Sequence, residues 1–120
     1  MCIRDRYQTI DGALDYTKRN YYSVVEHNPG KPVIKTEAGW TTCSNGRGIH
    51  SWNASQEFQA TYYRQLLDWC EEADILTFIF EAFDESWKGS ADPHEPEKHW
   101  GIFTIDRKPK LVMQEIYSHL

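Results

Sequence analysis

The feature that most constrains the fold of this 120-residue chain is a pair of short apolar segments, each preceded by a longer segment of helical periodicity. Residues 32–37 are typical of a short strand entered through a proline, and residues 75–80 form a nearly unbroken apolar run, which is typical of a strand buried on both faces. Residues 11–27 and 53–73 repeat apolar side chains at helical spacing. Strands that alternate with helices indicate an α/β fold with a parallel sheet. Two strands alone leave open edges, so we expect either that further strands complete the sheet or that the chain is part of a larger domain.

Local signals set the ends of the remaining elements. Asn53 is expected to cap the second helix, with Gln56 three residues later. Pro109 stands at the entrance of a short terminal helix, expected over residues 110–119. Two polar loops are predicted over residues 39–48 and 84–100.

Composition excludes several classes of function. The formal charge of −5, from 13 basic and 18 acidic residues, argues against a nucleic-acid partner, which would need a basic face. The sequence contains no apolar run long enough to span a bilayer. Aromatic residues are abundant, with 5 Trp, 7 Tyr and 5 Phe. Rings stack on the C–H faces of sugars, so this composition favours a carbohydrate ligand, although packing alone could also use the rings.

Cysteine and histidine patterns give little support for a metal centre. Cys2, Cys43 and Cys70 are odd in number and lack CxxC spacing, which excludes a disulfide framework and a cysteine-only zinc site. One loop gathers several possible ligands that a solvated loop would also explain: Asp92, His94, Glu95, Glu97 and His99. Their spacing does not match the helical HExxH pattern. We therefore expect no metal and no cofactor.

Acidic residues follow both predicted strands. Glu37 ends the first strand shortly before Trp40, and Glu85 follows the second strand shortly before Trp87. In α/β barrels the carboxyl ends of the strands carry the chemistry. Glycoside hydrolysis needs one carboxyl group as acid and another as nucleophile or base, which suits this arrangement. Position alone equally allows Glu37 and Glu85 to be helix caps or solvated loop charges.

Three segments, in order along the chain, carry a family resemblance. They are residues 32–40 (PVIKTEAGW), residues 78–88 (FIFEAFDESWK) and residues 97–109 (EKHWGIFTIDRKP). The first resembles the nucleophile strand of family 17 glycoside hydrolases, the β-1,3-glucanase-like barrels. The second resembles the final strand of that family, especially in its bacterial members, and the third resembles its closing segment.

The resemblance implies a fold larger than this chain. It implies a (β/α)₈ barrel, of which residues 32–37 would be strand seven and residues 75–82 strand eight. A complete barrel needs about 250 residues, so residues 1–120 are expected to form a partial domain, its C-terminal portion. Residues 1–6 resemble a leader appended to assembled gene fragments and are expected to be non-native.

The resemblance also implies roles for individual residues. Glu37 matches the nucleophile of a retaining enzyme. Glu85 and Lys88 match the Glu-x-x-Lys pair of the last loop, and Glu97 matches a later active-site glutamate. For Glu85 and Lys88, an ion pair that only fixes the loop is the structural alternative. The general acid of the family ends the fourth strand and has no counterpart here, so the isolated chain is expected to be inactive.

Four tryptophans divide between binding and packing in this interpretation. Trp40, Trp87 and Trp100 are candidates for stacking on sugar, although Trp100 also suits the core. Trp69 lies on the apolar stripe of the second helix and is assigned to the core. The family often has proline after Gly-Trp, where this chain has Thr41, and we expect the difference to affect loop shape more than chemistry.

Together these observations predict part of a retaining glycoside hydrolase that acts on β-1,3-glucan. The expected partner is a β-glucan oligosaccharide or polysaccharide, with no nucleic acid and no membrane segment in this chain. Transglycosylation uses the same residues as hydrolysis and stays open. A non-catalytic glucan-binding module and a small self-contained α/β interaction domain are the alternatives from other classes. Placement in the cell envelope or outside the cell follows only from where glucans occur.

Overall fold

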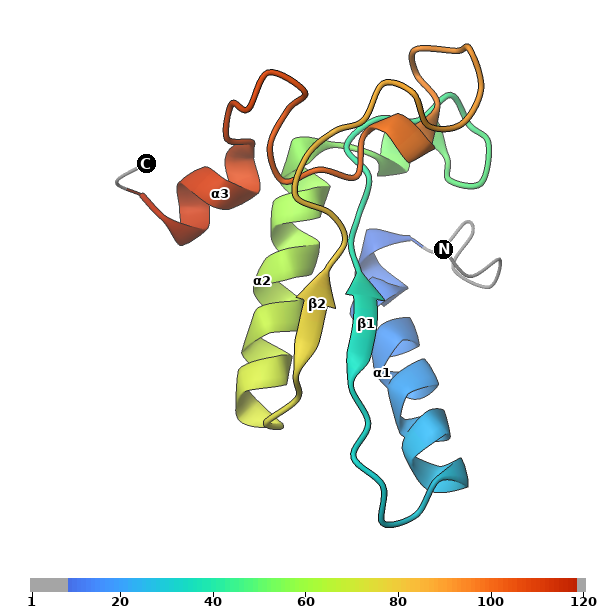
Figure 1. Cartoon of the computed structure of the whole chain (residues 1–120), viewed down its shortest axis with the longest axis vertical. Coiled ribbons are helices and arrows are strands. Elements are labelled where there is room, and N and C mark those ends of the chain that lie inside the picture. Colours follow the sequence, from blue (N-terminus) through green and yellow to red (C-terminus); the bar gives the residue numbers. More distant parts are fainter. Residues whose placement is uncertain (1–8, 119–120) are drawn as a thin grey trace.

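The computed structural model describes residues 9–118, so the expected leader over residues 1–6 lies outside the described part. Its helices and strands occur in the predicted order (Figure 1). The α-helices are α1 (Ile10–His27), α2 (Gln56–Glu72) and α3 (Leu111–Ile116), and the strands are β1 (Lys35–Ala38) and β2 (Thr77–Ile79). Two short 3₁₀ turns are η2 (Ser51–Asn53) and η3 (Pro96–Lys98). In this part of the chain, none of the helices has the length and hydrophobicity of a membrane span.

The two strands form a parallel sheet, as the helix–strand alternation predicts. Lys35 lies opposite Thr77 and Ala38 lies opposite Ile79, with an irregularity between them. Both strands are shorter than the predicted ranges 32–37 and 75–80. In the described residues, β1 and β2 pair only with each other. The outer edge of each strand therefore has no strand beside it.

The start of α2 differs from the prediction. Ser55, rather than Asn53, caps the helix, and its side chain accepts a hydrogen bond from the backbone N–H of Phe58. Asn53 is fully buried, and its side-chain oxygen accepts from the N–H of Ile10, in the first turn of α1. The asparagine therefore satisfies an N-terminal donor of a different helix from the one expected.

The end of the chain also differs from the prediction. Helix α3 covers Leu111–Ile116 instead of residues 110–119, of which 119 lies outside the described part. Lys110 precedes the helix in extended conformation, with its side chain buried among the loops.

The core forms around the inner face of α2. The predicted stripe is buried at Tyr62, Leu66 and Trp69, whereas Ala73 lies exposed at the C-cap, where the helix has ended. The hydroxyls of Thr17 and Tyr62 share a hydrogen bond of 2.9 Å that joins α1 to α2. This contact fixes α1 and α2 against each other beside the two strands.

One apolar surface of the sheet stays open. Ile34, Leu76 and Phe78 are 49%, 59% and 54% exposed, although residues of these types are normally buried. Figure 1 shows α1 and α2 beside the two strands, with the loops and η turns gathered beyond the carboxyl ends of both strands. Helices α1 and α2 thus lie beside the sheet, but the apolar surface at Ile34, Leu76 and Phe78 is not covered by the described part of the chain.

Candidate active site

The carboxyl ends of β1 and β2 are joined by close backbone contact. The N–H of Phe80 donates to the carbonyl of Ala38 at 2.8 Å. Gly39 lies so close to the Phe80 carbonyl that a Cβ at this position would overlap it. From α2, the hydroxyl of Tyr63 reaches the carbonyls of Ala38 and Phe80 at 3.3 and 3.1 Å. A buried tyrosine and a glycine therefore hold the two strand ends together.

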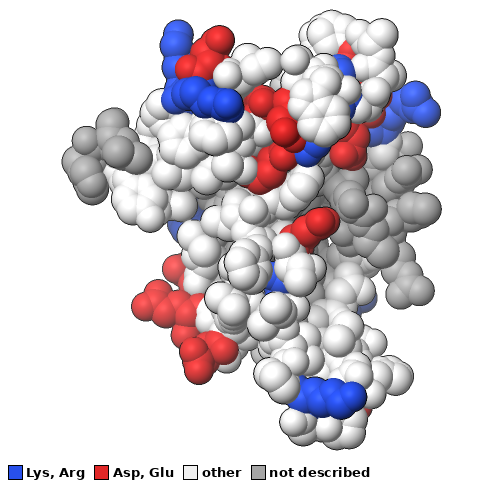
Figure 2. All heavy atoms as spheres, viewed as in Figure 1, with Lys and Arg blue, Asp and Glu red and all other residues white. Residues whose placement is uncertain are grey.

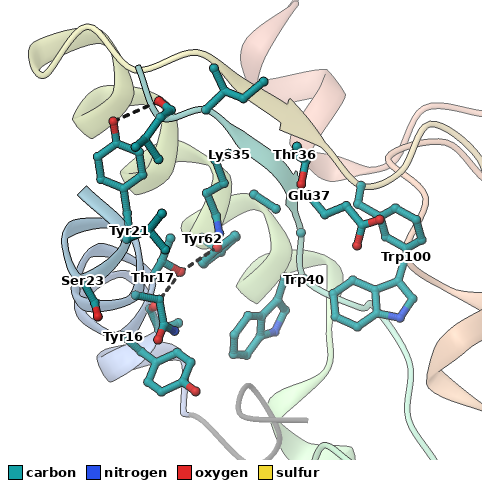
Figure 3. Close-up of a pocket in the computed structure, with 18 of the residues that line it drawn as sticks. Tyr16, Thr17, Tyr21, Ser23, Lys35, Thr36, Glu37, Trp40, Tyr62 and Trp100 are labelled. Atoms are coloured by element: carbon teal, nitrogen blue, oxygen red, sulfur yellow. Dashed lines mark hydrogen bonds between the residues drawn. The ribbon is translucent and has the colours of Figure 1, made fainter. Parts of the chain in front are cut away.

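Glu37 lies in the wall of a cavity at this junction. The cavity has a volume of about 470 Å³ and is lined mainly by α1, β1 and the residues that follow each strand. Glu37 is exposed at the penultimate position of β1. Figure 3 shows its side chain extending from β1 toward Trp100, with the ring of Trp40 farther away in the cavity wall. The carboxylate is thus accessible near the indole ring of Trp100.

The two tryptophans of the cavity are held in different ways. Trp40 is 6% exposed, packs against the ring of Tyr62, and donates its indole N–H to the carbonyl of Asn53 at 2.9 Å. Trp100 is 7% exposed and meets the ring of Phe80 edge to face. Both rings line the cavity while most of their surface is packed, so they contribute edges and small faces rather than open platforms.

A lysine between two glutamates follows β2. The Lys88 ammonium contacts the carboxylate of Glu81 at 2.7 and 2.9 Å and also contacts the carboxylate of Glu85. It lies 4.7 Å from the ring centroid of Phe80, a residue that lines the Glu37 cavity. We call Glu81, Glu85 and Lys88 the lysine cluster. Figure 2 shows acidic side chains, with basic atoms among them, over the loops beyond the strand ends.

The pKa values of the lysine cluster are shifted in different directions. Burial raises the pKa of Glu81, and contact with Glu85 adds to the rise against the hydrogen bond from Lys88. The hydrogen bond from Lys88, with a contribution from Glu81, lowers the pKa of Glu85. Burial opposes the charge of Lys88, but its two carboxylate partners outweigh burial and raise its pKa. The cluster therefore keeps Lys88 and Glu85 charged, and an added proton binds first at Glu81.

A second ion pair lies beneath the loops. Asp84 contacts Lys110 at 2.7 Å, with side chains only 12% and 2% exposed. Lys110 also donates to the hydroxyl of Thr42 at 2.8 Å, and the N–H of Gly101 donates to Asp84 at 3.0 Å. Burial acts to raise the pKa of Asp84, but its hydrogen bonds with His99 and Lys110 outweigh burial and lower it. This pair ties together the segments after β1 and β2 and the start of α3.

Other predicted site residues lie in the outer loop. Glu97 is half-buried in η3, next to Gly89, and Trp87 is 75% exposed in the loop after β2. The buried ammonium of Lys98 donates to the carbonyl of Ser86 at 2.9 Å and also to that of Lys88. Lys98 therefore holds the loop that carries Glu85 and Lys88 in its shape.

Thr41, at the position where the family often has proline, contacts two loop segments through its hydroxyl. Thr41 is fully buried, and its hydroxyl donates to the carbonyls of Cys43 and Pro96 at 3.0 Å each. A proline has no hydroxyl and could not make this contact between the loop after β1 and η3.

Sequence reasoning missed Glu81. It stands within the strand motif but was given no role, because the Glu-x-x-Lys spacing directed attention to Glu85. One feature of the sequence could have indicated it: Glu81 directly follows the predicted strand 75–80 and is the one charged residue within the apolar segment 78–83. In the described residues, no group of three or more His, Cys, Asp or Glu side chains is arranged to hold a metal ion, and Cys43 and Cys70 are free thiols.

Comparison with known proteins gives consistent results. The family model described as "Glycosyl hydrolases family 17" matches residues 24–114. A basic glucan endo-1,3-β-glucosidase of Solanum tuberosum is 28% identical over 116 residues, which cover 90% of this chain and 32% of the relative.

Two solved structures are similar in fold and sequence. An endo-laminarinase from Formosa matches with a TM-score of 0.82 and 31% identity, over 91% of this chain and 29% of that one. An active-site mutant of a Rhizomucor miehei β-1,3-glucanosyltransferase, in complex with laminaritriose, matches with a TM-score of 0.75 and 32% identity, over 88% of this chain and 37% of that one. The chain thus spans between about a quarter and two fifths of the length of these proteins.

Proposed function

The chain belongs to glycosyl hydrolases family 17, and from this premise we propose that the protein containing it is a retaining glycoside hydrolase of β-1,3-glucan, with Glu37 as nucleophile. The observation that carries the proposal is the exposed Glu37 carboxylate at the carboxyl end of β1, in a cavity that it shares with Trp40 and Trp100. Parallel strands place such a residue where barrel enzymes carry their chemistry.

We propose that β1 and β2 are the seventh and eighth strands of a (β/α)₈ barrel. Parallel pairing of two adjacent strands, each preceded by a helix, supports this placement. The open apolar surface at Ile34, Leu76 and Phe78 is what strands at a cut edge of a barrel would leave exposed. Residues 1–120 then form a partial domain, and the general acid belongs to a strand outside this sequence.

The reaction follows from the charges at the strand ends. The Glu37 carboxylate attacks the anomeric carbon while the general acid protonates the leaving oxygen, which gives a covalent glycosyl-enzyme. Water, activated by the same acid group acting as base, then releases the sugar. Glu85 and Lys88 support the substrate through hydroxyl contacts, Glu97 stands in the adjacent loop, and Trp87 offers an exposed ring for stacking.

Transfer to a second sugar is the other candidate reaction. Similarity to the Rhizomucor miehei β-1,3-glucanosyltransferase supports this second candidate. In transfer, a glucan hydroxyl replaces water in the second step, and Glu37 keeps the same role. Chromatography of the products from a short β-1,3-glucan separates the two reactions, because transfer gives chains longer than the substrate.

Replacement of Glu37 tests the proposal in the full-length protein. Glu37→Gln keeps the size of the side chain but removes the nucleophilic charge, so turnover of β-1,3-glucan should fall by about 1,000-fold or more while binding survives. Glu71→Gln, at an exposed position near the end of α2, is the matched control and should keep wild-type turnover.

Rescue by azide identifies the role of Glu37. In Glu37→Ala, azide fits the vacated space and attacks the anomeric carbon from the same side as the lost carboxylate. The expected product is the α-glycosyl azide, detected by NMR. Near-normal turnover of Glu37→Gln would eliminate Glu37 as nucleophile, and a wild type that binds β-1,3-glucan without turnover would favour a non-catalytic binding module.

A further inference from the structure

Glu81 is the innermost member of the lysine cluster. The side chains of Glu81 and Lys88 are 16% and 19% exposed, whereas that of Glu85 is 31% exposed. Lys88 reaches both carboxylate oxygens of Glu81 but a single oxygen of Glu85. The more sheltered partner of the lysine is therefore Glu81, and Glu85 is the member that a sugar hydroxyl can reach.

The backbone of Glu81 is hydrogen-bonded to the segment that begins at Trp100. Its N–H donates to the carbonyl of Trp100 at 3.3 Å, and its carbonyl accepts from the N–H of Ile102 at 3.0 Å. Both bonds join Glu81, which lies shortly after β2, to residues 100–102. Lys88, by contrast, reaches Glu81 from a loop, with its ammonium over the ring of Phe80. The Glu81 carboxylate thus extends from backbone that is bonded to this segment and meets the ammonium of the loop lysine.

We propose that Glu81 is a positioning residue of this enzyme: it anchors Lys88, which in turn holds the Glu85 carboxylate in place and ionised to accept a hydrogen bond from a sugar hydroxyl. This inference rests on the proposed function and assigns a role to a residue that does not itself touch the substrate. The raised pKa of Glu81 and the lowered pKa of Glu85 fit this order, because the inner carboxylate takes up a proton before the outer one.

A purely structural role for Glu81 would give a different result from a positioning role. If Glu81 only fixed the loop, its replacement would lower the melting temperature and leave the kinetics at low temperature unchanged. If Glu81 acts through Lys88, its replacement matters only while Lys88 is present. A double-mutant cycle separates these cases, since residues that act as one unit are not additive.

The experiment measures kcat/KM on β-1,3-glucan in the full-length protein for Glu81→Gln, Lys88→Met and the double variant. Each single change should lower kcat/KM by about tenfold or more, and Glu81→Gln should lower that of Lys88→Met by less than about twofold further. Glu81→Asp keeps the charge and should recover part of the loss. Glu71→Gln is the control for removal of a carboxylate at an exposed site.

Binding gives a second measurement that does not need turnover. In the Glu37→Gln background, calorimetry with laminaritriose should show about tenfold weaker binding when Glu81→Gln is added, with an unchanged melting temperature. Wild-type kinetics in Glu81→Gln, or losses that multiply in the double variant, would overturn the positioning role alone. A wild-type protein that neither binds nor cleaves β-1,3-glucan would overturn the proposed function, and this inference with it.

Discussion

Gly39 is the residue whose size matters most at the strand ends. Because a Cβ there would overlap the Phe80 carbonyl, Gly39→Ala must push β1 and β2 apart and weaken the 2.8 Å bond between Phe80 and Ala38. We expect a loss of about 2–3 kcal/mol in the free energy of unfolding, measured by urea denaturation of the full-length protein. Gly12→Ala, on α1, where a Cβ would meet only the Thr9 hydroxyl at an ordinary contact distance of 3.9 Å, should be neutral or stabilising by up to about 1 kcal/mol. Equal effects of the two changes would contradict this account.

At the residue scale, the sequence predicts which residue types stand near the site better than it predicts their partners. The position of Glu37 at the end of the first strand follows from the strand pattern, whereas Lys88 is indicated by the family resemblance. The pairing of Lys88 with Glu81 follows from neither, because it depends on how the loop after β2 folds back over Phe80. The cap at Asn53 is wrong for the same reason: its partner, Ile10, lies 43 residues away.

The loops after the two strands depend on one buried ion pair, and its strength should vary with pH. Asp84→Asn leaves Lys110 buried without its charged partner, so the free energy of unfolding at pH 7 should fall by about 3 kcal/mol. The pKa of Asp84 lies below its ordinary value of 3.8, so the folded state binds fewer protons than the unfolded state. This stabilisation is present above pH 3.8 and is lost as the pH falls through the folded-state pKa.

The stability gap between the wild type and Asp84→Asn should therefore narrow as the pH falls below about 4. Urea denaturation at a series of pH values measures this gap. Asp68→Asn, at an exposed position on α2, is the control and should change the free energy of unfolding by less than about 0.5 kcal/mol. A gap that stays constant from pH 7 to well below 4 would show that the charge of Asp84 is not what stabilises the loops.

At the scale of elements, the order of helices and strands is predictable because periodicity and breakers are local. The strand lengths are not, because a ladder ends where its neighbour ends, and β2 extends only over Thr77–Ile79. Residues 84–100 were predicted to form a polar loop, and in the structure they contain no α-helix or strand. The buried lysine of this loop, Lys98, follows from backbone carbonyls that only the folded loop brings together.

At the scale of the whole molecule, the exposed apolar surface of the sheet and the short span relative to known relatives have one common explanation. Both follow if β1 and β2 complete a barrel with strands from outside this sequence, as proposed above. The isolated chain should then be only marginally stable and should self-associate through its open strand edges. A dilute isolated chain that sediments as a monomer and melts in one sharp transition would contradict this view.

Phe78 allows a sharper test, because the barrel proposal predicts that its replacement improves the behaviour of the isolated chain but destabilises the full-length protein. Phe78 is 54% exposed in this chain, so Phe78→Ser should reduce self-association of the isolated chain, measured by sedimentation velocity. In the full-length protein the same side chain would be packed within the completed barrel, and its loss should lower the free energy of unfolding by about 3–5 kcal/mol. Thr61→Ser, on the outer side of α2, should change neither measurement appreciably. If Phe78→Ser left the full-length protein as stable as the wild type, the apolar surface would not be a barrel contact, and the assignment of β1 and β2 to its last two strands would have to be abandoned.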